Sequence, residues 1–231
     1  MTGMLASVEN LAEALCVLEA GADIIDLKSP SSGALGALPV ETVKEIAAAL
    51  AGRRPLSATI GDLPMIPAMV SMAAEAMAAT GVDYVKIGFF PGGDWHGTIF
   101  SLSPLAARGI RLVAVLFADQ KPDLSHVERL AGAGFSGVML DTLDKAGGSL
   151  TQVCPLANLR DFVAEAKARG LLCGLAGSLR QADIPLLLNL RPDYLGFRGA
   201  LCQQHERTAG LDNTAVQTIR ACLPILLTLS P

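Results

Sequence analysis

The sequence predicts a single (β/α)8 barrel that uses all 231 residues. Short apolar runs of strand length alternate with longer Ala- and Leu-rich helical patterns along the whole chain, and counting them gives eight pairs. Strict alternation of this kind indicates parallel strands, either in a closed barrel or in an open doubly wound sheet. The closed barrel is favoured because eight units fit the usual length of a barrel and no GxGxxG follows the first strand.

The predicted strands are apolar runs bounded by Gly, Pro, Asp or Ser. They cover residues 4–8, 23–28, 56–60, 84–89, 112–117, 137–141, 171–176 and 194–198. The helical patterns lie near residues 9–20, 39–51, 66–80, 98–108, 125–133, 155–169, 181–190 and 212–222. Gly21 and Gly81 each stand just before a strand, where a glycine commonly ends the preceding helix. We therefore expect residues 1–231 to form one domain.

Composition and charge indicate a small-molecule partner. The formal net charge is -4 and no Lys/Arg-rich run occurs, which argues against nucleic acid or an anionic membrane as the main partner. No apolar run approaches the roughly 20 residues that cross a bilayer, and the first ten residues do not resemble a secretory signal. The five cysteines have no CxxC spacing, as expected of reduced thiols in a cytoplasmic protein. A homo-oligomer is compatible with the sequence.

The segment 24–30 brings an acid and an amine together at the end of a strand. Side chains alternate faces in a strand, so Asp26 and Lys28 share a face while Leu27 points the other way. An interior Lys28 would lose water, which favours its neutral, nucleophilic form, and the carboxylate beside it could shuttle a proton. Alternatively, Lys28 reaches solvent and Asp26 caps the next loop. This segment alone leaves both interpretations open.

Three further polar residues point to the same end of the barrel. Lys86 lies between two apolar neighbours in a strand, with the parity of an interior residue, and burial of an unpaired ammonium there would be costly. Asp141 ends the sixth strand and Lys145 follows it. The carboxyl ends of barrel strands form the face that carries active sites, so we expect these residues to meet Lys28 there. Asp141 could instead only cap the loop after its strand.

Small residues follow the seventh and eighth strands, in the loops that commonly hold phosphate in barrels. These candidate phosphate contacts are Gly177, Ser178, Gly199 and Ala200. Arg198 would reach the same anion or pair with a barrel carboxylate, and Asp62 would contact substrate or form an Asx turn. The three histidines are scattered without metal-ligand spacing or a Ser/His/Asp relay, so no metal is predicted.

With these segments in place, the sequence resembles the (5-formylfuran-3-yl)methyl phosphate synthase family, the enzymes of the furan-forming step in methanofuran biosynthesis. The resemblance runs through nearly the whole chain. Its motifs are GADIIDLKSP at 21–30 with GALGA at 33–37, SATIGD at 57–62, VDYVKIG at 82–88, LDT at 140–142 with Lys145, GLLCGLAGS at 170–178 and GFRGA at 196–200. The chain departs from the family at 203–207, where a Gly-rich turn would be expected before a basic residue.

The resemblance implies a (β/α)8 barrel that joins two molecules of glyceraldehyde 3-phosphate into a furan aldehyde phosphate, with release of phosphate and water. It implies that Lys28 is the Schiff-base lysine and Lys86 a proton-transfer lysine, assisted by Asp26, Asp141 and Lys145. No redox step occurs in this reaction, so no cofactor is expected. The departure at 203–207 leaves the phosphate contact of the eighth loop open.

Two other functions fit parts of the same pattern. A class I aldolase or transaldolase acting on sugar phosphates would share the lysine and the phosphate loops but release a simple aldol product. A non-catalytic barrel could bind a phosphorylated metabolite and regulate a partner protein. An aldolase would give no furan absorbance with triose phosphate, so this measurement distinguishes it from a furan synthase. A binding protein would form no imine that borohydride can trap, which distinguishes it from both enzymes.

Overall fold

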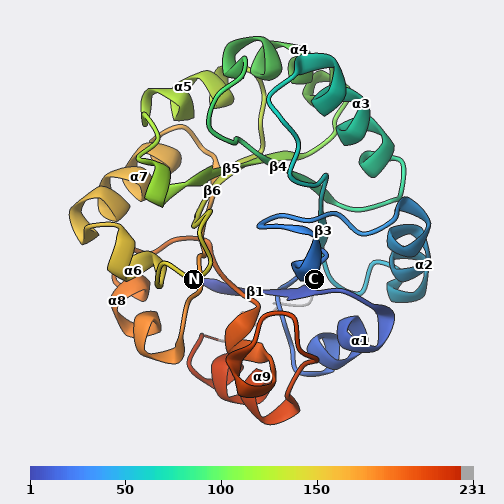
Figure 1. Cartoon of the computed structure of the whole chain (residues 1–231), viewed down its shortest axis with the longest axis vertical. Helices are drawn as coiled ribbons and strands as arrows, with labels where there is room; N and C mark the ends of the chain where they lie inside the picture. The colour runs from blue at the N-terminus through green and yellow to red at the C-terminus, as the bar shows by residue number, and fades with distance from the viewer. Residues whose placement is uncertain (225–231) are drawn as a thin grey trace, which may run out of the picture.

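The structure, a computed structural model, describes residues 1–224. Eight parallel strands pair in chain order from β1 to β8, and β8 pairs with β1 to close the barrel. Viewed down the barrel, the strands form an inner ring and the helices an outer one (Figure 1). The predicted (β/α)8 barrel is therefore confirmed.

The strands lie within two residues of their predicted bounds at each end. They are β1 Gly3–Val8, β2 Ile24–Leu27, β3 Leu56–Thr59, β4 Tyr84–Gly88, β5 Leu112–Phe117, β6 Gly137–Asp141, β7 Leu172–Leu175 and β8 Tyr194–Phe197. Strands β2 and β8 end one residue early, so Lys28 and Arg198 are the first residues of the loops that follow. Both side chains therefore belong to the rim of the barrel.

The helices follow the predicted order with three differences. They are α1 Leu11–Glu19, α2 Val40–Leu50, α3 Pro67–Ala78, α4 Trp95–Ala107, α5 Ser125–Gly132, α6 Leu150–Val153, α7 Leu156–Ala168, α8 Ile184–Leu188 and α9 Asn213–Ala221. Helix α4 begins three residues before the predicted start because the Asp94 carboxylate accepts a hydrogen bond from the Gly97 amide. The short helix α6 was not predicted; Ser149 and Gln152 form a capping box at its start.

The third difference concerns the predicted helix at 181–190. The structure divides it into a 3-10 turn, Gln181–Asp183, and the short helix α8. Pro185 stands at the start of α8, where its missing amide hydrogen removes no helical hydrogen bond. Four further 3-10 turns lie in loops: Pro30–Ser32, Ala118–Gln120, Gly199–Leu201 and Gln203–His205. The last two occupy the loop after β8, which borders the barrel mouth.

Two apolar cores result from the alternation of side chains along the strands. Outward-facing residues such as Val8 and Leu27 pack under the helices. Inward-facing Leu5, Val115 and Met139 belong to a separate cluster inside the barrel. Buried polar residues such as Ser7, Lys86 and Asp141 also face the barrel interior and open onto a cavity at its mouth.

All five cysteines are free thiols. Within residues 1–224, no helix is both long enough and apolar enough to cross a membrane.

Candidate active site

A cavity of about 470 Å³ opens at the carboxyl ends of the strands. Lys28, Lys86 and Lys145 line it together with Asp141, and the loops after β6, β7 and β8 form its rim. The sequence predicted that these residues meet at one end of the barrel, and the structure places them there. Three amines and a carboxylate in one polar cavity can perform amine chemistry and move protons.

The carboxylate of Asp26 lies at the centre of a buried polar network. Its neighbours in register are Ser7 on β1 and Ser57 on β3, and both hydroxyls donate to it, at 2.8 and 2.6 Å. Lys86 reaches from β4 and donates to Asp26 Oδ1 at 2.9 Å. Asp26 has no exposed surface. Three donors therefore hold one carboxylate inside the barrel wall.

These donors decide the ionisation of Asp26. Burial alone would raise the pKa of its carboxyl, but the charges of Lys86 and Lys28 and the hydroxyl of Ser57 outweigh burial, and the pKa is lowered. Asp26 is thus a carboxylate at neutral pH. The sequence paired it with Lys28, its neighbour two residues along. In the structure the amine that donates a hydrogen bond to Asp26 is that of Lys86, and Lys28 acts on this carboxylate through its charge alone.

Lys28 is the amine without a partner. Its side chain is 6% exposed, and across residues 1–224 its Nζ makes neither a hydrogen bond nor an ion pair with the protein. Burial lowers the pKa of Lys28 from 10.5 to about 8; Asp141 and Asp26 raise it, while Lys145 and Lys86 lower it. A substantial fraction of Lys28 is therefore neutral near physiological pH, as a nucleophilic amine must be.

Asp141 and Lys145 form the second ion pair of the cavity. Lys145 Nζ lies 2.6 Å from Asp141 Oδ1 and also donates to the Thr142 carbonyl. Burial would raise the pKa of Asp141, but the charges of Lys145 and Lys28 and the Thr142 amide outweigh it, and the pKa is lowered. Lys28 consequently faces a fixed carboxylate and ammonium on the opposite side of the barrel.

The loop after β7 turns tightly at Gly177 and Ser178. Gly177 has φ of +115°, and a Cβ there would lie 2.7 Å from the Thr142 methyl carbon, so only glycine fits. Ser178 has φ of +46° and donates to the Lys145 carbonyl at 3.1 Å. Both residues and Gly199 line the cavity. The buried Ala200 is not among the lining residues and lies beneath the rim.

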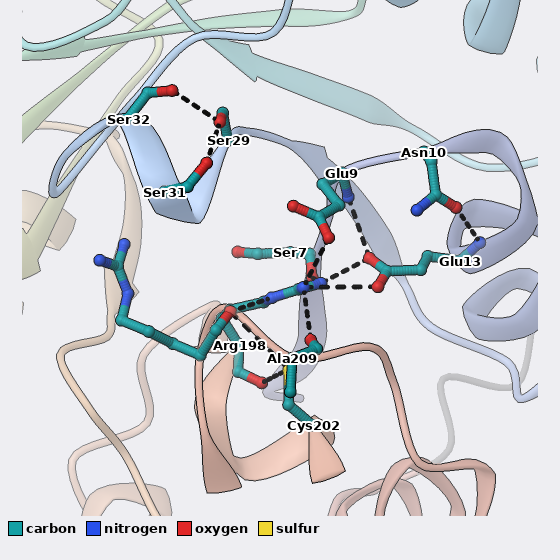
Figure 2. Close-up of polar contacts among 11 residues, drawn as sticks. Ser7, Glu9, Asn10, Glu13, Ser29, Ser31, Ser32, Arg198, Cys202 and Ala209 are labelled. Atoms are coloured by element: carbon teal, nitrogen blue, oxygen red, sulfur yellow. Dashed lines mark hydrogen bonds and ion pairs between the residues drawn. The ribbon is translucent and has the colours of Figure 1, made fainter.

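Arg198 holds the loop after β8 against the start of the barrel (Figure 2). Its guanidinium donates to Glu13 Oε2 at 2.5 Å, to the Arg207 carbonyl at 2.8 Å and to the Ala209 carbonyl at 3.0 Å. Glu9 adds an ion pair at 3.5 Å. Of the two roles considered from the sequence, the structure shows pairing with carboxylates. Arg198 touches the cavity, but its donors are already engaged by protein acceptors.

Asp62 lies away from the cavity and organises the loop after β2. Its carboxylate accepts from the amides of Ala34 and Leu35 at 2.8 and 2.7 Å, so it forms neither a local Asx turn nor part of the cavity lining. Gly33 stands beside it with φ of +130°, and a Cβ there would lie 2.2 Å from the carboxylate. Asp62 thus closes the loop that follows the Lys28 position.

Sequence reasoning missed several polar residues of the site. Ser7 and Ser57 are each in register with Asp26 and therefore face the barrel interior. The alternation of side chains along β1 and β3 is the signal that could have identified them. Arg180, His205 and Arg207 also line the cavity, from irregular loops that carry no periodic signal. In the described chain, residues 1–224, no group of three or more His, Cys, Asp or Glu side chains is placed to hold a metal ion.

The loop at 203–207 explains the departure noted in the sequence. Gln204 and His205 have left-handed φ values of 52° and 60°, the conformation that glycine adopts without a steric penalty. The backbone therefore keeps a turn of the glycine type although the side chains are larger. Arg207, the basic residue after this turn, extends its guanidinium to the Gly33 carbonyl at 2.9 Å.

The chain matches a known protein family over most of its length. Residues 4–220 match the family model described as 4-HFC-P synthase. The chain is 44% identical over 223 residues to "Putative (5-formylfuran-3-yl)methyl phosphate synthase" of Methylorubrum extorquens, covering 94% of this chain and 92% of that protein. It is 35% identical over 218 residues to the (5-formylfuran-3-yl)methyl phosphate synthase of Methanococcus maripaludis strain S2, covering 90% and 92%.

Among solved structures, phosphoribosyl anthranilate isomerase from Thermus thermophilus superimposes with a TM-score of 0.68 at 15% identity, covering 96% of this chain and 98% of that one. A likeness at this identity shows the fold alone. The sequence relatives extend over nearly the whole barrel and include the strands that carry the cavity residues. The chain therefore belongs to the 4-HFC-P synthase family, the family of the (5-formylfuran-3-yl)methyl phosphate synthases.

Proposed function

We propose that this protein is a lyase that condenses two molecules of glyceraldehyde 3-phosphate, through a Schiff base on Lys28, into (5-formylfuran-3-yl)methyl phosphate for methanofuran biosynthesis. The observation that carries the proposal is the unpaired, largely buried amine of Lys28, with a pKa of about 8, between two ion pairs. Family membership supports the choice of product.

The first steps follow from the chemistry of an amine and an aldehyde. Neutral Lys28 Nζ attacks the aldehyde carbon of one triose phosphate, and the carbinolamine loses water to give an iminium. The iminium withdraws electrons from the neighbouring carbon, which makes its proton acidic. Lys86, whose amine is held near Lys28 by Asp26, is the candidate for proton transfer in both steps. Its ammonium gives a proton to the departing hydroxyl of the carbinolamine, with Asp26 assisting this dehydration, and the neutral amine left behind accepts the carbon-bound proton.

Loss of the proton produces an enamine, from which the phosphate on the next carbon leaves by elimination. Joining to the second triose phosphate is a carbon–carbon bond formation at a carbonyl, and it is followed by ring closure and dehydration. The atoms balance when two trioses lose one phosphate and two molecules of water, so no oxidant or reductant enters. Asp141 and Lys145, paired across the cavity, are placed to move protons during ring closure.

The experiment that tests the proposal is incubation of the protein with glyceraldehyde 3-phosphate, followed by detection of furan absorbance and of released phosphate. We expect both to appear together, because the furan ring retains only one of the two phosphates. An aldol product with both phosphates retained would instead support an aldolase. Absence of any imine trapped by borohydride would support a binding protein.

The pH profile reports the ionisation of Lys28. The neutral amine is the reactive form, so kcat/KM of furan formation should rise about tenfold per pH unit below 8 and level off above it. The Asp141 charge raises the pKa of Lys28, so Asp141→Asn should move the inflection to lower pH. A profile with its inflection near the ordinary lysine value of 10.5, or no shift in the variant, would contradict the assignment.

Ser178→Asp tests whether the loop after β7 binds a phosphate. An aspartate tolerates the left-handed conformation of this position, but it places a carboxylate at the cavity wall against an anionic substrate. We expect the KM for glyceraldehyde 3-phosphate to rise at least about tenfold. Ser178→Asn is the matched control, with the same shape and no charge. An equal KM in the two variants would move the anion site elsewhere.

A further inference from the structure

Arg207 stands out among the cations of the cavity because most of its donors are free. It lines the cavity as a half-buried side chain, and among the described residues its guanidinium makes a single hydrogen bond, from Nη2 to the Gly33 carbonyl at 2.9 Å. Within residues 1–224 no carboxylate lies within ion-pair distance of its guanidinium. A guanidinium has five N–H donors, so four remain for a ligand.

The other cations of the cavity wall are already committed. Lys86 is paired with Asp26, Lys145 with Asp141, and Arg198 with a carboxylate on α1. Lys28 must be neutral to react, so it cannot neutralise a dianionic phosphate at the same time. Arg180 also borders the cavity, but its side chain is exposed, which weakens any contact with an anion. Arg207 is therefore the cation best placed to receive one.

The backbone of Arg207 is fixed from within the protein. Its carbonyl accepts a hydrogen bond from Arg198 Nε at 2.8 Å, and Arg198 is itself clamped to Glu13. A Cβ on Gly199 would lie 3.8 Å from the Cβ of Arg207 and 3.7 Å from Arg180 Nη1, so the two arginines flank this glycine. The base of the side chain is thus held in place before any ligand binds, which reduces the entropy lost on binding.

Burial lowers the pKa of the Arg207 guanidinium, while the charges of Asp141 and Asp62 raise it. A guanidinium has so high an ordinary pKa that it stays protonated in a protein. A permanent charge that is partly removed from water binds phosphate more strongly than an exposed one, because water competes less for its donors.

We propose that Arg207 binds a phosphate group of the triose phosphate substrate, and that Arg198 is a positioning residue that aims it. This assignment rests on the proposed function, which supplies a phosphorylated substrate. From the sequence, Arg198 could reach the anion or pair with a carboxylate, and Arg207 was given no role. Arg207 also contacts the loop that follows Lys28, so it connects the phosphate to the segment that carries the nucleophile.

Direct binding gives the first test and needs no turnover. Glycerol 3-phosphate, which cannot form an imine, is titrated by calorimetry into the unmodified protein and into Arg207→Gln, Arg207→Lys and Arg108→Gln. Arg108 is an exposed residue paired with Glu75 on the outside of the barrel, so its variant matches the charge change only. We expect the Kd to rise about 10- to 100-fold in Arg207→Gln, less in Arg207→Lys, and to stay unchanged in Arg108→Gln.

A second measurement separates phosphate binding from support of the loop. Borohydride trapping is followed as a function of the concentration of glyceraldehyde 3-phosphate and, separately, of glyceraldehyde. Arg207→Gln should require a higher concentration of the phosphorylated triose and the same concentration of the unphosphorylated one. Equal loss for both trioses would overturn the proposal, because the residue would then act only by holding the loop after β2.

Two other results would also overturn it: an unchanged Kd for glycerol 3-phosphate in Arg207→Gln, or no binding of glycerol 3-phosphate to the unmodified protein. Failure of the proposed function has a different signature. In that case furan absorbance is absent from the unmodified protein, while the calorimetric difference between Arg207→Gln and Arg108→Gln persists.

Discussion

Lys28→Arg should lose both furan formation and the imine trapped by borohydride. Within residues 1–224 the Lys28 amine has no protein partner, and burial lowers its pKa to about 8, so a neutral fraction is available to attack an aldehyde. A guanidinium in the same place stays protonated and cannot attack a carbonyl. The measurement is incorporation of substrate mass after borohydride reduction, together with product absorbance.

Lys44→Arg is the matched control, since Lys44 lies on α2 in an exposed ion pair with Glu41. It should retain trapping and turnover at the level of the unmodified protein. Circular dichroism should show that both variants keep the barrel. If Lys28→Arg still traps substrate, another amine carries the imine.

Lys86→Arg should fail in a different way, with imine formation retained and turnover reduced. Lys86 is 2% exposed and hydrogen-bonded to Asp26, which makes it a candidate for proton transfer rather than for attack. Arginine preserves the positive charge beside the carboxylate but does not release its proton, so it can neither donate a proton nor take one back. The expected loss in kcat is about 10²- to 10⁴-fold, the usual contribution of a general acid or base.

Rapid-quench measurement of the trapped imine and of the furan in the same samples separates the two effects for Lys86→Arg. The imine should accumulate while furan formation is slow. A kcat within about tenfold of the unmodified protein would show that Lys86 transfers no proton in a slow step. Loss of the imine to the same extent as in Lys28→Arg would make the two lysines indistinguishable, which also contradicts the assignment.

Strand parity predicted much of the barrel interior. It placed Lys86 inside because its neighbours Val85 and Ile87 face the helices, and it placed Asp26 and Lys28 on one face with Leu27 on the other. The structure agrees for all of these residues. The alternation of side chains is informative here because each barrel strand turns one face to the interior core and the other to the core under the helices. A register shift of one residue would send the side chains of each face to the wrong core.

Pairing between strands was beyond this reasoning. Asp26 lies two residues before Lys28, so the sequence associated the two, yet the amine that donates a hydrogen bond to Asp26 is that of Lys86, 60 residues away. The register of β2, β3 and β4 sets that contact, and register is a property of the closed barrel. Arg198 likewise has a distant carboxylate partner, because it donates to Glu13 on α1, 185 residues away.

The conformation of the loop after β8 also could not be predicted from the sequence. Its residues Gln204 and His205 adopt left-handed conformations that a sequence without glycine does not indicate. Glycine at these positions would have predicted a tight turn, with Arg207 beyond it at the cavity. Without glycine, the segment 203–207 was interpreted as a departure from the family, and Arg207 was not predicted to line the cavity. Irregular backbone brings a charged side chain to the cavity here without a local signal in the sequence.

Peptide mapping of the borohydride-reduced complex tests the central claim most directly. The unmodified protein is incubated with glyceraldehyde 3-phosphate, reduced, digested and analysed by mass spectrometry. We expect one adduct, on Lys28, in the peptide that joins β2 to the loop closed by Asp62. An adduct on Lys86 or Lys145 with Lys28 unmodified would contradict it, because the unpaired amine of this cavity would then not be its nucleophile.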